Sequence, residues 1–336
     1  MDVYRRRFEP AINFLDYCFF ISFFPKLVAG PIVRAADFIP QIRSKIQLEE
    51  SDVGRAVFLI AGGLFKKAVI SDYISTNFVD RVFDSPALYS GFENLMAVYG
   101  YALQIYCDFS GYSDMAIGLA LMMGFRIPMN FDAPYQSTSI TEFWRRWHIS
   151  LSTWLRDYLY ISLGGNRSGK LRQYLNLMIT MLLGGLWHGA SWKFVVWGGL
   201  HGAALAIEKA ILSVVKIPAA FVFKLIGGLL TFHFVCFCWI FFRASSFENA
   251  SQVVSQISGS FNISLVPDVI VGYGNVFLLL IFGYLLHLLP ARIDTKVEDR
   301  LTSSPLFVKS LILAAVIYLV IQVRSADIQP FIYFQF

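Results

Sequence analysis

The sequence contains few charged residues. Lys, Arg, Asp and Glu make up 15% of its 336 residues, whereas hydrophobic residues make up 56%. Ordinary soluble domains carry about 25% charged and about 45–50% apolar residues. This composition excludes an ordinary soluble domain and predicts a polytopic membrane protein. The net charge of +5 is modest and does not indicate a nucleic-acid partner.

Several catalytic signatures are also missing. The four cysteines lie in apolar runs without a CxxC pair, and no HExxH or Cys/His cluster occurs, so no metal site is predicted. No GxSxG accompanies the histidines, which argues against a serine hydrolase. The basic loop Gly164–Lys170 imitates a phosphate-binding loop. Leu171 stands where that loop needs Ser or Thr, so NTPase activity is not expected.

Long hydrophobic segments dominate what is present. Backbone groups in lipid must be hydrogen-bonded internally, and the alternation of a barrel strand is missing, so we predict an all-α fold. No repeat of 20–50 residues is visible in the sequence, so we predict one domain over residues 1–336. The clearer membrane spans are Gln173–Gly189, Phe194–Ala210, Phe221–Phe242, Val276–Leu289 and Phe307–Val323. Charge, Pro or Gly interrupts three further segments, which we expect to be broken or re-entrant helices lining a cavity: Ala11–Val33, Arg55–Ile70 and Leu95–Phe125.

The distribution of Lys and Arg predicts an orientation for the second half. Cytoplasmic loops of membrane proteins carry an excess of these residues. The segment Thr141–Arg172 is rich in Arg, whereas Ala244–Gly274 contains neither Lys nor Arg. We therefore expect the first segment to be cytoplasmic and the second to lie outside, with Lys209, Lys216 and Lys224 inside.

An amphipathic helix is predicted to begin at Ser139. Ser139 followed by Glu142 fits a capping box. At helical spacing, one face is aromatic and apolar and the other carries Arg145, Ser152 and Arg156, with His148 at the border. Such a helix is expected along the cytoplasmic interface. Its basic stripe could hold a phosphate-bearing donor or could simply meet lipid headgroups.

His188 is the most informative single residue. It lies between Trp187 and the Gly189–Trp192 segment, in a stretch that otherwise reads as membrane-embedded helix. Titratable groups at that depth usually face a bundle interior or a water-filled cavity, and imidazole exchanges protons near neutral pH. We therefore interpret His188 as a candidate acid or base, with Trp187, Ser191 and Trp192 as cavity-lining candidates. The single histidines His233 and His287 are interpreted as packing residues.

Two carboxylates lie in another apolar stretch. Asp108 and Asp114 flank Gly111. They could line the cavity, or they could be structural, by accepting hydrogen bonds from backbone exposed at a break at Gly111 or by pairing with Arg126. The sequence leaves both readings open.

Several motifs in order resemble the membrane-bound O-acyltransferases, especially the bacterial branch that acetylates alginate and other exopolysaccharides. The resemblance covers nearly the whole chain. Its motifs are Phe23–Ile32, Asp108–Asp114, Phe143–Ser152, Arg156–Tyr158, Leu163–Arg167, Trp187–Trp192, Phe241–Ala244 and Phe331–Phe336.

The resemblance implies a multi-helix core in the bacterial inner membrane, perforated by a funnel or tunnel. The invariant family histidine corresponds to His188, and an upstream polar position corresponds to His148. Members of this branch are thought to pass acetyl groups from a cytoplasmic thioester, acetyl-CoA or another acyl donor, without a bound cofactor. The receiver would be a periplasmic acetyltransferase or the polysaccharide export machinery. Arg145, Arg156, Arg167 and Lys170 are the expected donor-binding residues.

One departure concerns the beginning of the chain. Family members usually have several further transmembrane helices before the segment that matches Asp2–Arg5. The sequence therefore suggests an N-terminally incomplete domain. Two other classes stay open beside the enzyme: a transporter whose broken helices line a permeation path, and a non-catalytic membrane scaffold.

Overall fold

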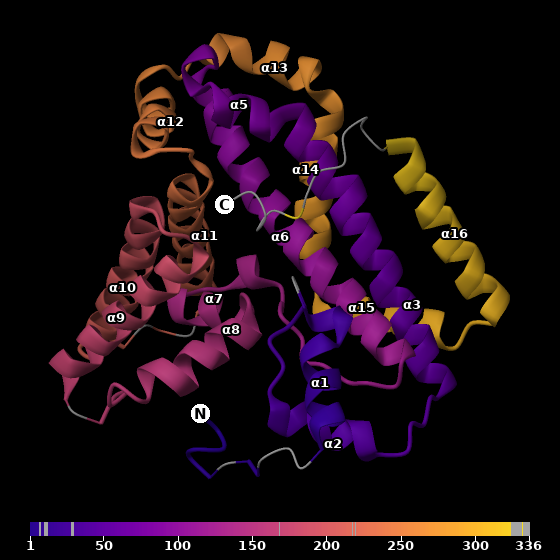
Figure 1. Cartoon of the computed structure of the whole chain (residues 1–336). Helices are drawn as coiled ribbons and strands as arrows, with labels where there is room; N and C mark the ends of the chain where they lie inside the picture. The colour runs from indigo at the N-terminus through magenta and orange to yellow at the C-terminus, as the bar shows by residue number, and fades with distance from the viewer. Residues whose placement is uncertain are drawn as a thin grey trace.

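The computed structural model describes residues 1–6, 8–9, 13–27, 30–167, 169–216, 218, 220–323 and 331. Across these residues every regular element is helical, which confirms the predicted all-α class (Figure 1). The helices outside the site are α1 (Phe14–Ser22), α2 (Ala35–Arg43), α3 (Glu50–Leu64), α4 (Asp72–Ile74), α5 (Asp80–Asp84), α6 (Gly91–Met122), α12 (Phe247–Gly259), α13 (Val266–Gly272), α14 (Gly274–His287), α15 (Ala291–Thr302) and α16 (Leu306–Val323). Those that build the site are α7 (Ile140–Arg146), α8 (Ile149–Trp154), α9 (Lys170–His188), α10 (Trp192–Leu212) and α11 (Phe221–Arg243).

The long helix α6 forms the middle of the molecule. It runs without interruption for 32 residues and begins with a capping box between Ser90 and Glu93. The predicted break at Gly111 is therefore wrong. Gly111 instead lets α6 approach α3, because a Cβ on Gly111 would lie 2.7 Å from the carbonyl oxygen of Gly63. Figure 1 shows α3 and α16 on one side of α6 and α9 to α11 on the other.

Among the residues that the structure describes, three helices are long and apolar enough to cross a membrane: α10, α11 and α16. They confirm the predicted spans 194–210, 221–242 and 307–323. The predicted span 276–289 corresponds to α14, which follows the helical segment Ile263–Gly272 after a 90° bend. Only the two segments together are long and apolar enough to form a membrane span. Residues 173–188 lie in α9 and Gly189 follows it, but α9 is not among the candidate membrane spans.

The other two interrupted segments differ from each other. Residues 55–70 are continuous, because α3 runs directly into a π-helical stretch at Phe65–Ser71, so the expected break is wrong there too. Residues 11–33 are broken: α1 ends at Ser22 and a 3₁₀ turn follows at Phe24–Lys26. Ala11, Ile12, Val28 and Ala29 lie outside the described residues, as do the last five residues of the 331–336 motif.

Two hydrophobic cores hold these helices together. The smaller one joins α1, α2 and the end of α6 around Phe23, Phe38 and Phe125. The larger one contains Trp147, Trp197 and Trp239, all fully buried. Three of the cysteines belong to the larger core, as their apolar surroundings predicted: Cys107, Cys236 and Cys238. The larger core surrounds the candidate site.

Candidate functional site

His148 lies at a break between two short helices. Helix α7 ends at Arg146, and α8 begins at Ile149, so the single amphipathic helix predicted from Ser139 is wrong. His148 adopts φ 42° and ψ 57°, a left-handed conformation that costs a non-glycine residue about 1–2 kcal/mol. Asn130 holds this turn: its carbonyl oxygen accepts a hydrogen bond from the Ile149 amide at 2.9 Å, and its Oδ1 accepts one from Ser150 Oγ at 2.6 Å.

The start of α7 agrees with the sequence in part. Ser139 caps the helix, since its Oγ accepts a hydrogen bond from the Glu142 amide at 3.1 Å. The Glu142 carboxylate does not return to Ser139; it accepts hydrogen bonds from the amide and hydroxyl of Thr138. Glu208 of α10 binds the amides of Ile140 and Thr141 at 2.7 and 3.1 Å. This second anionic cap comes from a distant part of the chain and was not predicted.

His188 is the last residue of α9, beside the start of α10. The two helices approach closely through glycines: a Cβ on Gly185 would lie 2.2 Å from the Phe194 carbonyl oxygen, and one on Gly198 would lie 2.3 Å from the Met181 carbonyl oxygen. Small residues are the usual means of such close packing in membranes. The result places the half-buried His188 ring 5.2 Å from the Trp197 ring.

The structure brings His148 and His188 together around Trp187. The Trp187 ring centroid lies 5.1 Å from that of His188 and 6.3 Å from that of His148. His148 is 4% exposed and packs edge-to-face on Phe109 of α6 at 4.6 Å. Burial lowers the pKa of the His148 imidazole well below its ordinary value, and the charge of His188 lowers it further. Residues far apart in the sequence thus form one compact site.

The other residues predicted around His188 have different environments. Trp187 contacts both histidines although 57% of its surface is exposed. Ser191 is the residue that precedes α10, and Trp192 is 75% exposed. Of the three predicted lining residues, only Trp187 is therefore placed between the histidines.

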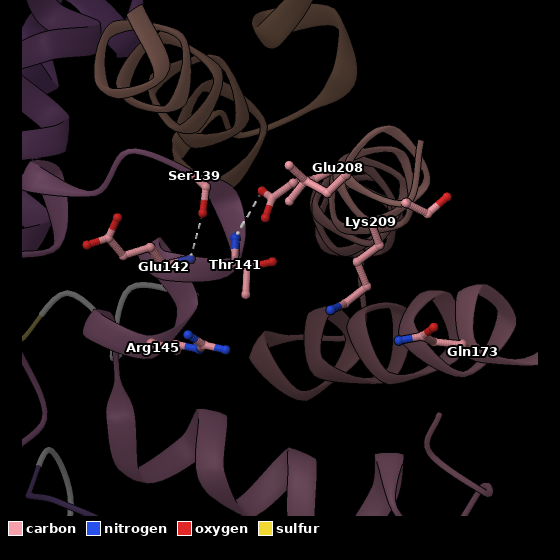
Figure 2. A pocket seen from close by; sticks show the side chains of 9 residues that line it. Ser139, Thr141, Glu142, Arg145, Gln173, Glu208 and Lys209 are labelled. Carbon is pink, nitrogen blue, oxygen red and sulfur yellow. Dashed lines mark hydrogen bonds between the residues drawn. The ribbon is translucent and has the colours of Figure 1, made fainter. Parts of the chain in front are cut away.

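A basic cleft opens between α7, the segment after α8, and the α9–α10 pair. It consists of two adjoining hollows of about 660 and 440 Å³ that share Thr141, Arg145, Gln173 and Lys209. Figure 2 shows the first hollow, with Arg145 and Lys209 on facing elements. The second hollow is also lined by Ser152 and Arg156, so Arg145, Ser152 and Arg156 line one hollow although they belong to separate helical segments and not to the single predicted helix.

The charges in the basic cleft are unevenly neutralised. Arg156 pairs with Asp157 at 2.7 Å, and hydrogen bonds from Arg156 and Arg34 hold the pKa of the Asp157 carboxyl below its ordinary value. Glu142 pairs with Arg146 at 2.9 Å. In the part of the chain that the structure describes, Arg145 and Lys209 have no carboxylate partner. These two cations remain available to an anionic ligand.

Two predicted donor-binding residues lie elsewhere. Arg167 and Lys170 are exposed and are not among the residues that line either hollow. Lys209 takes their place in the cleft. The sequence offered little indication of this role for Lys209, because its proximity to Arg145 arises from the contact between α10 and the start of α7, where Glu208 binds two backbone amides.

A family model described as MBOAT, membrane-bound O-acyltransferase family, matches residues 5–250. The chain belongs to the membrane-bound O-acyltransferase family. The matched segment includes both histidines and the whole basic cleft.

Several relatives of this membrane-bound O-acyltransferase are named as O-acetyltransferases or O-acetylases. The chain is 43% identical over 255 residues to the peptidoglycan O-acetyltransferase of Helicobacter pylori, covering 75% of this chain and 48% of that protein. It is 38% identical over 355 residues to the probable alginate O-acetylase AlgI of Pseudomonas putida, covering 100% of this chain and 72% of that protein. For the probable alginate O-acetylase AlgI of Pseudomonas fluorescens, the identity is 47% over 254 residues, with coverages of 75% and 50%. The chain spans about half the length of the first and third of these relatives.

In this membrane-bound O-acyltransferase, Asp108 and Asp114 form ion pairs within the bundle. Asp108 is buried and lies 2.5 Å from Lys67 Nζ, which also pairs with Asp72 at 2.7 Å. Asp114 lies 2.5 Å from Lys66 Nζ. The predicted pairing with Arg126 is wrong, since Arg126 pairs with Asp52 at 3.0 Å. The pairs join α6 to the π-helical stretch 65–71.

The other three histidines lie away from Trp187. His287 Nε2 accepts a hydrogen bond from the Tyr135 amide at 3.1 Å. His233 is exposed on α11, with Nδ1 2.8 Å from the Leu229 carbonyl oxygen. His201 is buried, and its Nδ1 accepts a hydrogen bond from Trp144 Nε1 at 3.3 Å. Neither His233 nor His287 packs around Trp187, in agreement with their interpretation as packing residues.

Proposed function

We propose that this chain forms the acyl-transferring part of a bacterial inner-membrane O-acetyltransferase. It would pass acetyl groups from a cytoplasmic thioester, such as acetyl-CoA, towards hydroxyls of an exported polysaccharide or a periplasmic acetyltransferase partner. The observation that carries the proposal is the packing of both His148 and His188 on Trp187. Helices α7, α9 and α10, which meet around these histidines, also line the cleft with two available cations. The names of the relatives support the acetyl group and the polysaccharide acceptor.

His188 would act as the general base. Its imidazole takes the proton of the acceptor hydroxyl as that oxygen attacks the thioester carbonyl carbon. The carbon–sulfur bond then breaks, and the imidazolium returns the proton to the leaving thiolate. General-base catalysis of this kind contributes about 10²–10⁴-fold. A transient acyl-histidine is an alternative route through the same residue.

His148 would position or polarise the thioester. The left-handed turn directs its ring into the bundle, where Phe109 and Trp187 hold it. The strain at this residue supports a functional role, since left-handed non-glycine residues cluster at functional sites.

The basic cleft would bind the phosphates of the donor. Arg145 and Lys209 supply charges without carboxylate partners, and Arg156 adds a third that Asp157 partly neutralises. Charge-assisted hydrogen bonds from such groups are about twice as strong as neutral ones. Arg167 and Lys170 would act only as an outer basic surface. We place the cleft on the cytoplasmic side and propose that a funnel or tunnel connects it to the histidines, with the α7–α8 segment along the interface.

Substitution of His188 tests this proposal. His188→Ala and His188→Gln should lower acetate in the exported polysaccharide at least a hundredfold, because the base is lost. Membrane-inserted protein should be unchanged. His233→Ala is the matched control, since His233 is exposed on α11 away from the site. Normal acetate in the His188 variants would refute the proposal.

A second measurement separates the enzyme from a transporter. Membrane vesicles that contain the full chain are given acetyl-CoA labelled in the acetyl group. An O-acyltransferase transfers the labelled acetyl group to a hydroxyl and releases coenzyme A. A transporter moves the label into the lumen of the vesicle and releases no coenzyme A. Label flux that His188→Ala leaves intact would favour the transporter.

A further inference from the structure

An apolar groove lies between α6, α11 and α14, and none of its lining residues also lines the basic cleft. Its volume is about 810 Å³, within the range of about 300–1,000 Å³ of small-molecule sites. Residues of α6, α11 and α14 line it, together with the 3₁₀ turn at Pro134–Gln136. Most of the lining side chains are apolar or aromatic.

Two phenols of the groove walls are hydrogen-bonded to backbone rather than offered to the groove. Tyr284 Oη donates a hydrogen bond to the Tyr99 carbonyl oxygen at 2.8 Å, and Tyr135 Oη donates one to the Ala102 carbonyl oxygen at 2.6 Å. Both phenol hydroxyls are therefore hydrogen-bonded to backbone carbonyl oxygens of α6. Gly228 presents no side chain to the groove. The walls are therefore largely hydrocarbon, and at Gly228 the backbone of α11 itself faces the groove.

The groove has one polar end. Lys224, Gln136 and Thr138 line it there, and a Cβ on Gly227 would lie 2.6 Å from the Thr138 carbonyl oxygen, which shows how closely α11 meets this end. Gln136 Nε2 also donates to the carbonyl oxygens of His287 and Leu289, so the end of α14 lies at the same level. Phe232 and Phe277 line the groove farther along α11 and α14. The groove is thus polar at one end and apolar at the other.

The length of the groove matches one leaflet of a bilayer. The lining residues run from Phe221 to Phe232 on α11 and from Phe277 to Leu288 on α14. Eleven helical steps of 1.5 Å give about 16 Å, close to half of a hydrocarbon core of about 30 Å. An acyl chain of a membrane lipid whose headgroup lies at Lys224 would extend about 12 Å along α11, to Phe232, and about 16 Å along α14, from Leu288 to Phe277. This reach and the gradient of polarity fit one acyl chain.

The charge at the polar end favours an anionic headgroup. Among the described residues, no carboxylate pairs with Lys224, and the nearby Glu142 is already paired with Arg146. The surrounding lipid is as apolar as the groove, so burying a tail gives no preference among lipids. The preference must come from the headgroup.

We propose that this groove binds an anionic phospholipid of the membrane, with one acyl chain between α11 and α14 and its phosphate at Lys224. The site lies apart from the two histidines and does not depend on the proposed acyl transfer. A bound lipid would fill the space between two membrane helices that both pack against α6.

Native mass spectrometry of the full chain tests this proposal. The protein is extracted in detergent, washed, and offered phosphatidylglycerol and phosphatidylethanolamine in equal amounts. Leu229→Trp should fill the groove and lower retained lipid about tenfold. Leu230→Trp is the matched control, because Leu230 is adjacent and 67% exposed but does not line the groove, whereas Leu229 is 52% exposed within it.

The headgroup contact is tested by Lys224→Gln. Loss of this charge should reduce the ratio of bound phosphatidylglycerol to phosphatidylethanolamine about fivefold, the factor that one lysine near a membrane surface contributes. Lys216→Gln, outside the groove, should leave the ratio unchanged. Equal lipid retention by the two Trp variants, or an unchanged ratio in Lys224→Gln, would overturn the proposal. So would a dimer that Leu229→Trp dissociates, since a second copy would then be the occupant.

Discussion

The two histidines of the candidate site reach it by different physical means. His188 ends a regular helix whose position is set by glycine contacts between α9 and α10. His148 occupies a left-handed turn that hydrogen bonds to Asn130 hold in place. The first arrangement is a low-strain consequence of helix packing. The second stores conformational strain, so its geometry depends on contacts from another part of the chain.

The largest expected effect comes from breaking the α9–α10 contact. Gly185→Ala would place a Cβ 2.2 Å from the Phe194 carbonyl oxygen, and that backbone atom cannot move without separating the helices. Such overpacking costs about 1–3 kcal/mol and displaces His188 from Trp197. Acetyl transfer and the thermal midpoint of the detergent-solubilised protein should both fall. Gly199→Ala is the control, since its Cβ meets only the Leu182 side chain, at an ordinary 3.5 Å. Equal effects of the two substitutions would show that this close contact does not set the site.

A smaller effect separates the strain at His148 from its imidazole. His148→Ala and His148→Gly both remove the ring, but only glycine adopts the left-handed conformation freely. The glycine variant should therefore be more stable than the alanine variant by about 1–2 kcal/mol, seen as a higher thermal midpoint. Acetyl transfer should be lost equally in both. Activity retained by His148→Gly would mean that this residue serves only as a turn.

The smallest effect concerns the charges shared by the two parts of the site. Arg145→Gln on α7 and Lys209→Gln on α10 should each raise the KM for the acyl donor several-fold with little change in kcat. Each replaces a charge-assisted contact with a neutral one, a difference of about 1 kcal/mol. If both cations bind one ligand, the double variant should deviate from additivity in a double-mutant cycle. Arg167→Gln should behave as the wild type; a KM increase there would place the donor phosphates on the outer surface.

Much of the architecture was predictable because it depends on local composition. The low charge and the apolar runs predicted the all-α class and three of the membrane helices, and Ser139 predicted the start of α7. The breaks expected at Gly111 and within residues 55–70 were wrong for one reason. Glycine and lysine in an apolar stretch are ambiguous: Gly111 serves close helix contact, and Lys66 and Lys67 neutralise Asp114 and Asp108 across that contact.

The sequence by itself determined the membrane class, the main apolar helices and His188 as the residue to consider first. These follow from composition, periodicity and a titratable group in an apolar setting, all of which are local. Only the tertiary structure decided that His148 turns inward at a helix break, that Lys209 joins Arg145, and that Asp108 and Asp114 meet lysines. Each depends on partners far away in the chain, and periodicity carries no information on which helices meet. The polar end of the groove at Lys224 has the same origin, because it is formed where α11 meets the end of α14.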